Sequence, residues 1–253
     1  PGGNVIRTLP AGTYEIAISS GAAEGGSYQL ALRDLSAATP LVLDTTTTVN
    51  LDPGNGHKAF SFTWPGGSAP VQIEANNTGG PRAYWRLIGP NGEVYTQQRA
   101  DVTDFQATLG AAGTYYLLYD GQIESSAPTS ATVKVRRTTV SSAAMALDTT
   151  VSGQLAGVGD SNSHVFTVTG TRRIMLDNLT ARTDLRVTIS GQGGALYSQV
   201  MFYSDGDYRG DAAVLVLGPG TYSVTVTGEG RATGDYAFAL HDLDAAPVLV
   251  PGA

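Results

Sequence analysis

The sequence contains no cysteine in its 253 residues. This absence excludes disulfides, thiolate metal sites and cysteine nucleophiles together, although it leaves the redox compartment open. The sequence also has no run of 18 apolar residues, so we expect no membrane-spanning helix. It begins at Pro1 without a signal peptide. We therefore expect it to be a processed or excised piece of a longer protein.

Charge is scarce as well, and positive charge most of all. Only 15% of the residues are charged, two of them are lysines, and the net charge is −7. An acidic chain without a basic stripe is not expected to bind nucleic acid. The abundance of Gly, Thr and Val instead favours β structure with tight turns. Low lysine with high Thr, Ser and Gly is typical of an exported, protease-exposed surface.

One short stretch occurs three times. Each copy starts at a turn whose glycine can take a positive φ without steric cost, and continues as the alternating pattern of a half-buried strand. The three tyrosines at the same place are expected to be corner tyrosines, with the ring in the core and the hydroxyl bonded to nearby backbone. The copies are Leu9-Pro-Ala-Gly12-Thr-Tyr14, Leu109-Gly-Ala-Ala-Gly113-Thr-Tyr115 and Leu217-Gly-Pro-Gly220-Thr-Tyr222.

Two further landmarks set the period of the repeat. The stretch Leu41-Val-Leu-Asp44-Thr45 returns as Met145-Ala-Leu-Asp148-Thr149, which is 104 positions later. The stretch from Gly26 to Asp34 returns from Gly234 to Asp242, twice that distance away. A period of about 104 residues is that of a whole domain.

This period predicts the organisation of the chain. Residues 1–37 are the C-terminal part of one repeat, residues 38–140 and 141–246 are two complete repeats, and residues 247–253 are the start of a next repeat or a tail strand. Both ends then cut through a repeat.

Within the repeats the sequence predicts only short strands. Strands at this spacing, without a helical period, indicate an all-β fold of tandem antiparallel β-sandwich repeats, jelly-roll or immunoglobulin-like, with roughly seven to nine strands each and no helix longer than a turn. Gly89-Pro-Asn-Gly92 is expected to be a hairpin turn. Besides the strands after each Gly-Thr-Tyr turn, we expect strands at 60–64, 71–74, 84–88, 93–95, 105–109, 132–135, 165–168, 173–176, 185–189, 213–217 and 236–240.

The turn and strand motifs together resemble the bacterial pre-peptidase C-terminal domain. The resemblance is carried by Ala11-Gly-Thr-Tyr14 with Gly26-Ser-Tyr28-Gln-Leu30, by Pro219-Gly-Thr-Tyr222 with Gly234-Asp-Tyr236-Ala-Phe238, and by Phe60-Ser-Phe62 followed by Pro90-Asn-Gly92. The middle repeat departs from the pattern at Ser130-Ala-Thr-Val133, and the last repeat lacks the Pro-Asn-Gly turn. The resemblance implies a jelly-roll-like sandwich of a secreted bacterial protein that serves secretion, spacing or attachment and is not catalytic. It also implies calcium as an optional ligand, because some members bind it.

No catalytic residue is predicted. The three histidines, His57, His164 and His241, have no neighbouring serine nucleophile motif or second histidine at metal-ligand spacing. His57 and His164 both precede matching strands, so we expect them to occupy equivalent positions. Their expected role is structural.

Two alternatives for binding are left open by the sequence. Asp205, Asp207 and Asp211 form the densest acidic loop and could offer hard oxygens to Ca²⁺, although the spacing is not that of an EF-hand. Carbohydrate is the other alternative, through Tyr84, Trp85 and Trp64. Parity with Phe60 and Phe62 places Trp64 in the core, and of the adjacent Tyr84 and Trp85 one must point outward.

Two sequons, Asn76-Asn-Thr78 and Asn178-Leu-Thr180, match the glycosylation rule. In a bacterial source we expect both to stay unmodified.

The two ends carry strand sequences without evident partners. A lone hairpin is marginal in water, so the apolar residues Ile16, Ile18, Leu30 and Leu32 need a cover. The tail residues Val248, Leu249 and Val250 form a further unpaired strand. Either the neighbouring repeats of a longer array cover them, or one chain's tail augments the next chain's hairpin and builds an open fibre.

The sequence therefore predicts a non-catalytic structural module of an extracellular or cell-surface protein. Its partners are neighbouring repeats or copies of itself. The alternative is a carbohydrate- or calcium-binding accessory module of a secreted hydrolase or adhesin.

Overall fold

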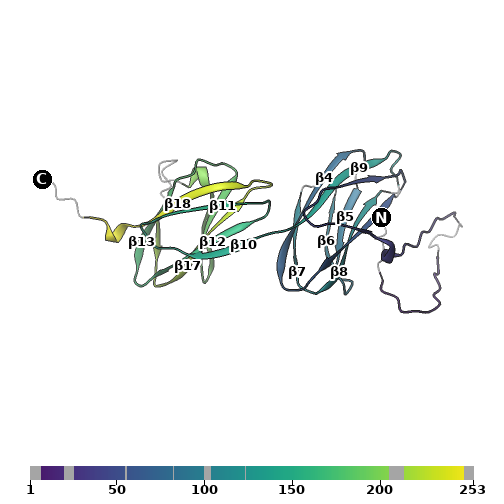
Figure 1. Cartoon of the computed structure of the whole chain (residues 1–253), viewed down its shortest axis with the longest axis horizontal. Coiled ribbons are helices and arrows are strands. Elements are labelled where there is room, and N and C mark those ends of the chain that lie inside the picture. The colour runs from purple at the N-terminus through teal and green to yellow at the C-terminus, as the bar shows by residue number, and fades with distance from the viewer. Residues whose placement is uncertain are drawn as a thin grey trace. The chain divides into compact units, whose positions relative to one another are not determined.

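The protein is all-β and forms two β-sandwiches (Figure 1). The computed structural model describes residues 7–19, 26–54, 56–81, 83–99, 104–122, 124–204 and 214–247. The chain divides into two compact units between Val135 and Arg136, with residues 69–72 grouped with the second unit. The predicted fold class is confirmed.

The first sandwich contains strands β1 to β9. One of its sheets has the order β1-β3-β8-β5-β6, and the other has the order β2-β9-β4-β7. The strands are β1 (Thr39–Pro40), β2 (Thr47–Leu51), β3 (His57–Trp64), β4 (Ala69–Gly79), β5 (Ala83–Ile88), β6 (Val94–Arg99), β7 (Phe105–Leu109), β8 (Gly113–Gly121) and β9 (Thr129–Arg137).

The second sandwich repeats this topology with strands β10 to β18. Its sheets have the orders β10-β12-β17-β14-β15 and β11-β18-β13-β16, so each strand takes the place of the strand nine earlier. The strands are β10 (Val140–Ala144), β11 (Thr150–Leu155), β12 (Ser161–Val168), β13 (Arg172–Asn178), β14 (Leu185–Gly191), β15 (Gly194–Val200), β16 (Val214–Leu217), β17 (Gly220–Gly228) and β18 (Gly234–Asp242).

Helical structure in the described ranges is confined to single 3-10 turns. They are η1 (Leu35–Ala37), η2 (Met201–Tyr203) and η3 (Leu243–Ala245). None of the helices in this part of the chain is long and apolar enough to cross a membrane.

The core of each sandwich follows from period-2 alternation. In β3, Phe60, Phe62 and Trp64 are buried while the residues between them are more exposed. In the second sandwich, Val224 and Val226 of β17 are buried in the same alternating way. Full burial of one such side chain contributes roughly 1.5–3 kcal/mol. Burial of these apolar side chains between the two sheets is therefore the main stabilisation of each sandwich.

Strand register shows that the two sandwiches are built alike. In the first, Phe62 pairs with Tyr115 and Trp64 pairs with Gly113. In the second, Phe166 pairs with Tyr222, and Val168 pairs with Gly220. The central pair β3 and β8 therefore corresponds, residue by residue, to β12 and β17.

The first strand of each sandwich is parallel to its neighbour, which the sequence pattern did not predict. Strand β1 pairs with β3 in parallel, and β10 pairs with β12 in the same way. A parallel pair needs a crossover connection. In both sandwiches the intervening strand, β2 or β11, lies in the opposite sheet and provides it.

The predicted hairpin turn joins β5 to β6. Gly92 has a φ of 82° and its amide donates to the carbonyl of Gly89 at 3.0 Å. The equivalent hairpin between β14 and β15 pairs Gly191 with Gly194, and Gln192 and Gly193 form the loop. A two-residue loop replaces the Pro-Asn-Gly turn that is missing from the last repeat.

Candidate functional site

The three repeated tyrosines make the same hydrogen bond. The Tyr115 hydroxyl donates to the carbonyl of Ala111 at 3.0 Å, and the Tyr222 hydroxyl donates to Gly218 at 2.9 Å. Tyr14 donates to Pro10 at 2.5 Å, again four residues upstream. The corner is thus a local structure, fixed by the turn that precedes the tyrosine.

The rings of the second and third tyrosines pack alike. Tyr115 stacks on Phe62 and Tyr222 stacks on Phe166, both with ring centroids 5.6 Å apart. The ring of Tyr14, in contrast, is 50% exposed. The tyrosine corner therefore forms at all three copies, whereas core packing of the ring is found only where a sandwich surrounds it.

Of the three turn glycines, Gly113 uses the positive φ that glycine allows, and the other two do not. Gly113 has a φ of 140°, and an added Cβ would lie 2.7 Å from the Cβ of Pro90. At Gly12 and Gly220 the φ is not positive, and a Cβ would make only ordinary contacts with the neighbouring tyrosine ring. The extra residue of the middle copy changes the turn, which explains why only Gly113 needs the left-handed conformation.

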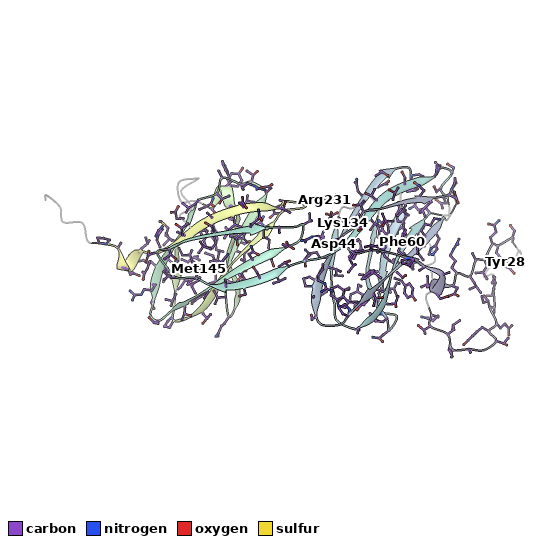
Figure 2. The ribbon with its side chains drawn as sticks, viewed as in Figure 1. Tyr28, Asp44, Phe60, Lys134, Met145 and Arg231 are labelled. Atoms are coloured by element: carbon purple, nitrogen blue, oxygen red, sulfur yellow. The ribbon has the colours of Figure 1, made fainter. Side chains whose placement is uncertain are left out.

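Residues 7–19 and 26–34 contain no strand, which corrects the expectation of a hairpin there. The candidates for strand addition, Ile16, Ile18, Leu30 and Leu32, are all exposed. Figure 2 shows Tyr28 on this segment, outside the strands of the first sandwich. The pattern alone does not make a strand because an isolated hairpin lacks the partners that would bury its apolar face.

The same segment nevertheless keeps a local turn found at the end of the second sandwich. Asp34 accepts a hydrogen bond from the amide of Ser36 at 2.8 Å and caps η1, while Asp242 accepts from Asp244 at 3.0 Å and caps η3. The φ and ψ of the two caps are −82° and 116° in η1 and −83° and 99° in η3. Local side-chain bonds therefore set the same geometry twice.

Two groups of predicted site residues lie outside the described residues. They are the calcium candidates Asp205, Asp207 and Asp211 and the tail residues Val248, Leu249 and Val250. Within the described part of the chain, no group of three or more acidic or histidine side chains is arranged to hold a metal ion. Calcium binding at the acidic loop stays a prediction.

His57 belongs to a buried charged cluster on β3, β5 and β8. Its Nδ1 lies 2.5 Å from Oδ1 of Asp120, and the Arg86 guanidinium donates to Oδ2 of Asp120 at 2.5 and 3.2 Å. Burial alone would raise the pKa of Asp120, but the hydrogen bonds from His57 and Arg86 and the guanidinium charge outweigh it and lower the pKa. His57 Nε2 is buried without a hydrogen-bond partner among the described residues. The cluster binds three neighbouring strands together.

His164 occupies a different place, so the expected equivalence of the two histidines is wrong. His57 is the first residue of β3 and pairs with Asp120, whereas His164 is the fourth residue of β12 and pairs with Val224. The register of His164 is that of Phe60 in the first sandwich. Burial lowers the pKa of His164, and its Nε2 lies 2.8 Å from the Tyr236 hydroxyl.

His241 lies between two carboxylates at the end of β18. Its Nδ1 is 3.3 Å from Asp148, and its Nε2 is 3.3 Å from Asp177. Asp148 also accepts from the amide of Asp242 at 3.2 Å. Both ring nitrogens are thus engaged in contacts that join β13, β18 and the loop before β11.

The second sequon has a structural role. Asn178 donates from Nδ2 to the carbonyls of Thr180 and Met201. The Thr180 hydroxyl donates to the carbonyl of Ala237 at 3.0 Å and accepts from the Ala237 amide at 2.6 Å. The Asn and Thr side chains anchor the loop after β13 to β18, which leaves the Asn178 amide engaged within the fold.

Both tryptophans are buried, so Trp64, Trp85 and Tyr84 do not form an exposed aromatic platform. Trp64 lies in the core as its parity predicted. Trp85 stacks on Tyr119 with ring centroids 4.2 Å apart, and burial raises the pKa of Tyr119 to about 12. Tyr84 is the outward-facing neighbour, and its hydroxyl accepts from Gln122 at 3.2 Å.

The second sandwich carries a shallow, open groove of about 820 Å³ beside β11 and β18. Polar groups along it are already bonded to one another: Gln154 donates to Asp235 at 2.8 Å, and Arg182 donates to Asp184 and to the carbonyl of Thr233. The lining residues are Ser152–Gln154, Leu179–Arg182 and Asp235–Ala237.

No family model and no curated protein matches the sequence. Among solved structures, the pre-peptidase C-terminal domain of a collagenase from Bacillus anthracis matches 39% of this chain and 93% of that domain, at 20% identity and a TM-score of 0.32. PliG of Aeromonas hydrophila, a periplasmic inhibitor of g-type lysozyme, matches 39% of this chain and 95% of its own length, at 13% identity and a TM-score of 0.31.

The CUB1-EGF-CUB2 region of human MASP-1/3 matches more of the chain. It covers 77% of this chain and 99% of its own length, at 6% identity and a TM-score of 0.24. At these identities the similarity concerns the fold alone. The chain consists of β-sandwich modules that resemble pre-peptidase C-terminal and CUB domains.

Proposed function

We propose that the chain is a non-catalytic structural module of an extracellular or cell-surface bacterial protein, made of tandem sandwiches similar to the pre-peptidase C-terminal domain. The main support for this proposal is that equivalent residues make the same contacts in both sandwiches. Tyr115 and Tyr222 make the same corner bond and the same aromatic stack. A spacer is built from repeated modules of the same structure, and these repeated contacts are consistent with that design.

The titratable groups support the same proposal. Asp120 is bonded to His57 and Arg86, and both nitrogens of His241 face carboxylates. An active site would bring together a nucleophile, a base and a donor for the developing oxyanion. These clusters instead join neighbouring strands, so we expect no catalysis from them.

The proposal is tested by pulling the chain from both ends in single-molecule force spectroscopy. Two separate unfolding events are expected, each releasing about 100 residues, or about 350 Å at about 3.6 Å per residue. The D120N variant should weaken one event and leave the other unchanged. A single event that releases both sandwiches together would contradict a tandem spacer.

A second candidate function is carbohydrate binding in the groove beside β11 and β18. The amide of Gln154 and the carboxylate of Asp235 are of the kind that orient a sugar, which would replace the 2.8 Å hydrogen bond that the two make to each other. A glycan array with the natural chain and with D235A tests it. Binding that disappears in D235A would favour this function, and an array without signal would exclude the sugars displayed.

A further inference from the structure

The segment of residues 7–34 resembles the sequence of residues 215–242, which contain β17 and β18, but it lacks their surroundings. Every matched position lies 208 residues before its counterpart. Val224, Val226, Phe238 and Leu240 are completely buried in the second sandwich. The four counterparts, in the same order, are Ile16 at 47%, Ile18 at 49%, Leu30 at 56% and Leu32 at 79% exposure.

The counterparts of this segment hold the middle of a sandwich. Strand β17 lies between β12 and β14, and β18 lies between β11 and β13 in the opposite sheet. A segment with this pattern thus requires a strand on each side in both sheets. A single added strand cannot provide them.

We propose that residues 7–34 are the closing strands of a third sandwich, whose other strands come from an acceptor polypeptide with the pattern of β10 to β15 and without strands of its own at the places of β17 and β18. This inference rests on the proposed function, because it extends the tandem array by one module. The corner bond from Tyr14 to Pro10 and the turn capped by Asp34 are already formed. The acceptor therefore needs to supply only the long-range pairing.

The alternating pattern of apolar residues in the segment fits an acceptor of this kind. Tyr28, Leu30 and Leu32 lie on one face of the alternating pattern, as Tyr236, Phe238 and Leu240 do in the second sandwich. All three of the latter are buried between the two sheets. The acceptor thus provides strand neighbours of the kind that β11 and β13 are for β18, and an opposite sheet with an apolar face.

The tail of the same chain is not the matching acceptor. Counting from Asp242, residues 248–250 correspond to residues 40–42, which include the end of β1. Strand β1 lies at the edge of its sheet beside β3, and β10 lies at the edge beside β12. Neither is a neighbour of the strands that correspond to residues 7–34. A tail-to-hairpin fibre would therefore require a pairing that neither sandwich uses.

The test is to place a copy of residues 141–208 directly before Pro1, which restores the spacing of the repeat. Amide hydrogen exchange then compares residues 7–34 with residues 215–242 in the same molecule. The inference expects exchange at residues 7–34 to slow by at least 100-fold relative to the natural chain. The matched control carries I16D and L30D in the same extended chain and should lose this protection while residues 38–246 keep theirs.

A second variant covers the case in which the extension does not fold. Residues 7–34 replace residues 215–242 of the natural chain, a substitution of equal length, and the second sandwich is expected to stay folded. Slowed exchange in either variant supports the inference, and its absence from both overturns it. Protection that appears in the natural chain only as its concentration rises would identify a second copy as the occupant and would also overturn it. None of these results changes the two unfolding events of residues 38–246, so failure here is distinct from failure of the spacer function.

Discussion

Asp44 and Asp148, which stand 104 positions apart, share a left-handed backbone conformation with φ of 63° and 60°. Their amides donate at 2.8 Å to equivalent carbonyls, those of Val135 in β9 and Leu240 in β18. They are the non-glycine residues with positive φ in the described part of the chain. Aspartate is among the few side chains that tolerate this conformation, which explains why the Leu-Asp-Thr landmark recurs.

This conformation predicts the effect of substitutions at Asp44. D44V should lower the free energy of unfolding of the first sandwich by about 1–2 kcal/mol, because a branched Cβ crowds the carbonyl in the left-handed region. D44G is the matched control and should leave stability unchanged or slightly improved. Urea unfolding measures both, and equal losses for the two variants would contradict the explanation.

The turn glycines offer a second matched pair. G113A should destabilise the first sandwich by about 1–3 kcal/mol, because the new Cβ meets Pro90 at 2.7 Å and φ is 140°. G220A should be neutral or stabilise by up to about 1 kcal/mol, because its Cβ makes only ordinary contacts. Thermal unfolding compares the two, and a larger loss from G220A would show that the contrast in backbone geometry is not what matters.

Substitutions of the three corner tyrosines should differ in how much they lower the free energy of unfolding. Y115F and Y222F remove a hydrogen bond to backbone and should each cost about 0.5–1.5 kcal/mol, confined to the sandwich that carries the variant. Y14F should cost nothing measurable, because the ring of Tyr14 is exposed and no sandwich depends on it. Denaturant titration of the three variants separates these outcomes, and a global loss in Y14F would contradict them.

The pKa of Asp120 predicts acid sensitivity of the first sandwich. Its pKa is lowered in the folded protein, so the unfolded chain takes up a proton first as the pH falls. The stabilisation is complete above the unfolded pKa of about 3.9 and is lost as the pH drops through the folded pKa. D120N should reduce this dependence and, at neutral pH, cost about 3–5 kcal/mol, because Arg86 stays buried without its carboxylate. Unfolding between pH 2 and 7 tests both effects, with D44G as a control that keeps the cluster.

The pKa of His164 predicts a different window for the second sandwich. Burial lowers this pKa from 6.5, so the unfolded state binds a proton more readily. Stability contributed by the neutral ring is complete above pH 6.5 and falls as the pH decreases from there towards the folded pKa. H164F, which introduces the residue found at the equivalent Phe60, should remove this dependence. Retention of the same pH profile in H164F would assign it to another group.

The strands that the sequence did not predict share one property. Strands β1, β2, β10, β11 and β15 all lie at sheet edges. Every residue of β10 is exposed, and β15 has no buried residue. An edge strand packs on fewer neighbours, so it needs no regular apolar alternation. The central strands were predictable because both of their flanks and one face are covered.

The N-terminal segment shows the opposite limit. Residues 14–18 and 28–32 have clear alternation, yet they form no strand. The alternating sequence pattern indicates which face of a strand could be buried. A strand forms only where other strands are present to cover that face. The corner of Tyr14 and the cap at Asp34 were within reach of the sequence because both depend on residues two to four positions away.

The candidate contacts were harder to predict than the fold. The cluster of His57, Arg86 and Asp120 joins residues that are up to 63 positions apart. Only strand register brings them together, and no local motif encodes it. For the same reason, the similar settings of His57 and His164 in the sequence hid a difference of three positions in register.

The place of β17 and β18 has a consequence for biosynthesis. These two strands are the last of their sandwich to leave the ribosome, yet each is flanked on both sides by strands made earlier. Until they emerge, the nascent module has a gap through the middle of both layers and exposes its apolar interior to other chains and to chaperones. Each module can thus close only when its final segment has been translated, so an array of them matures one unit at a time from the amino end.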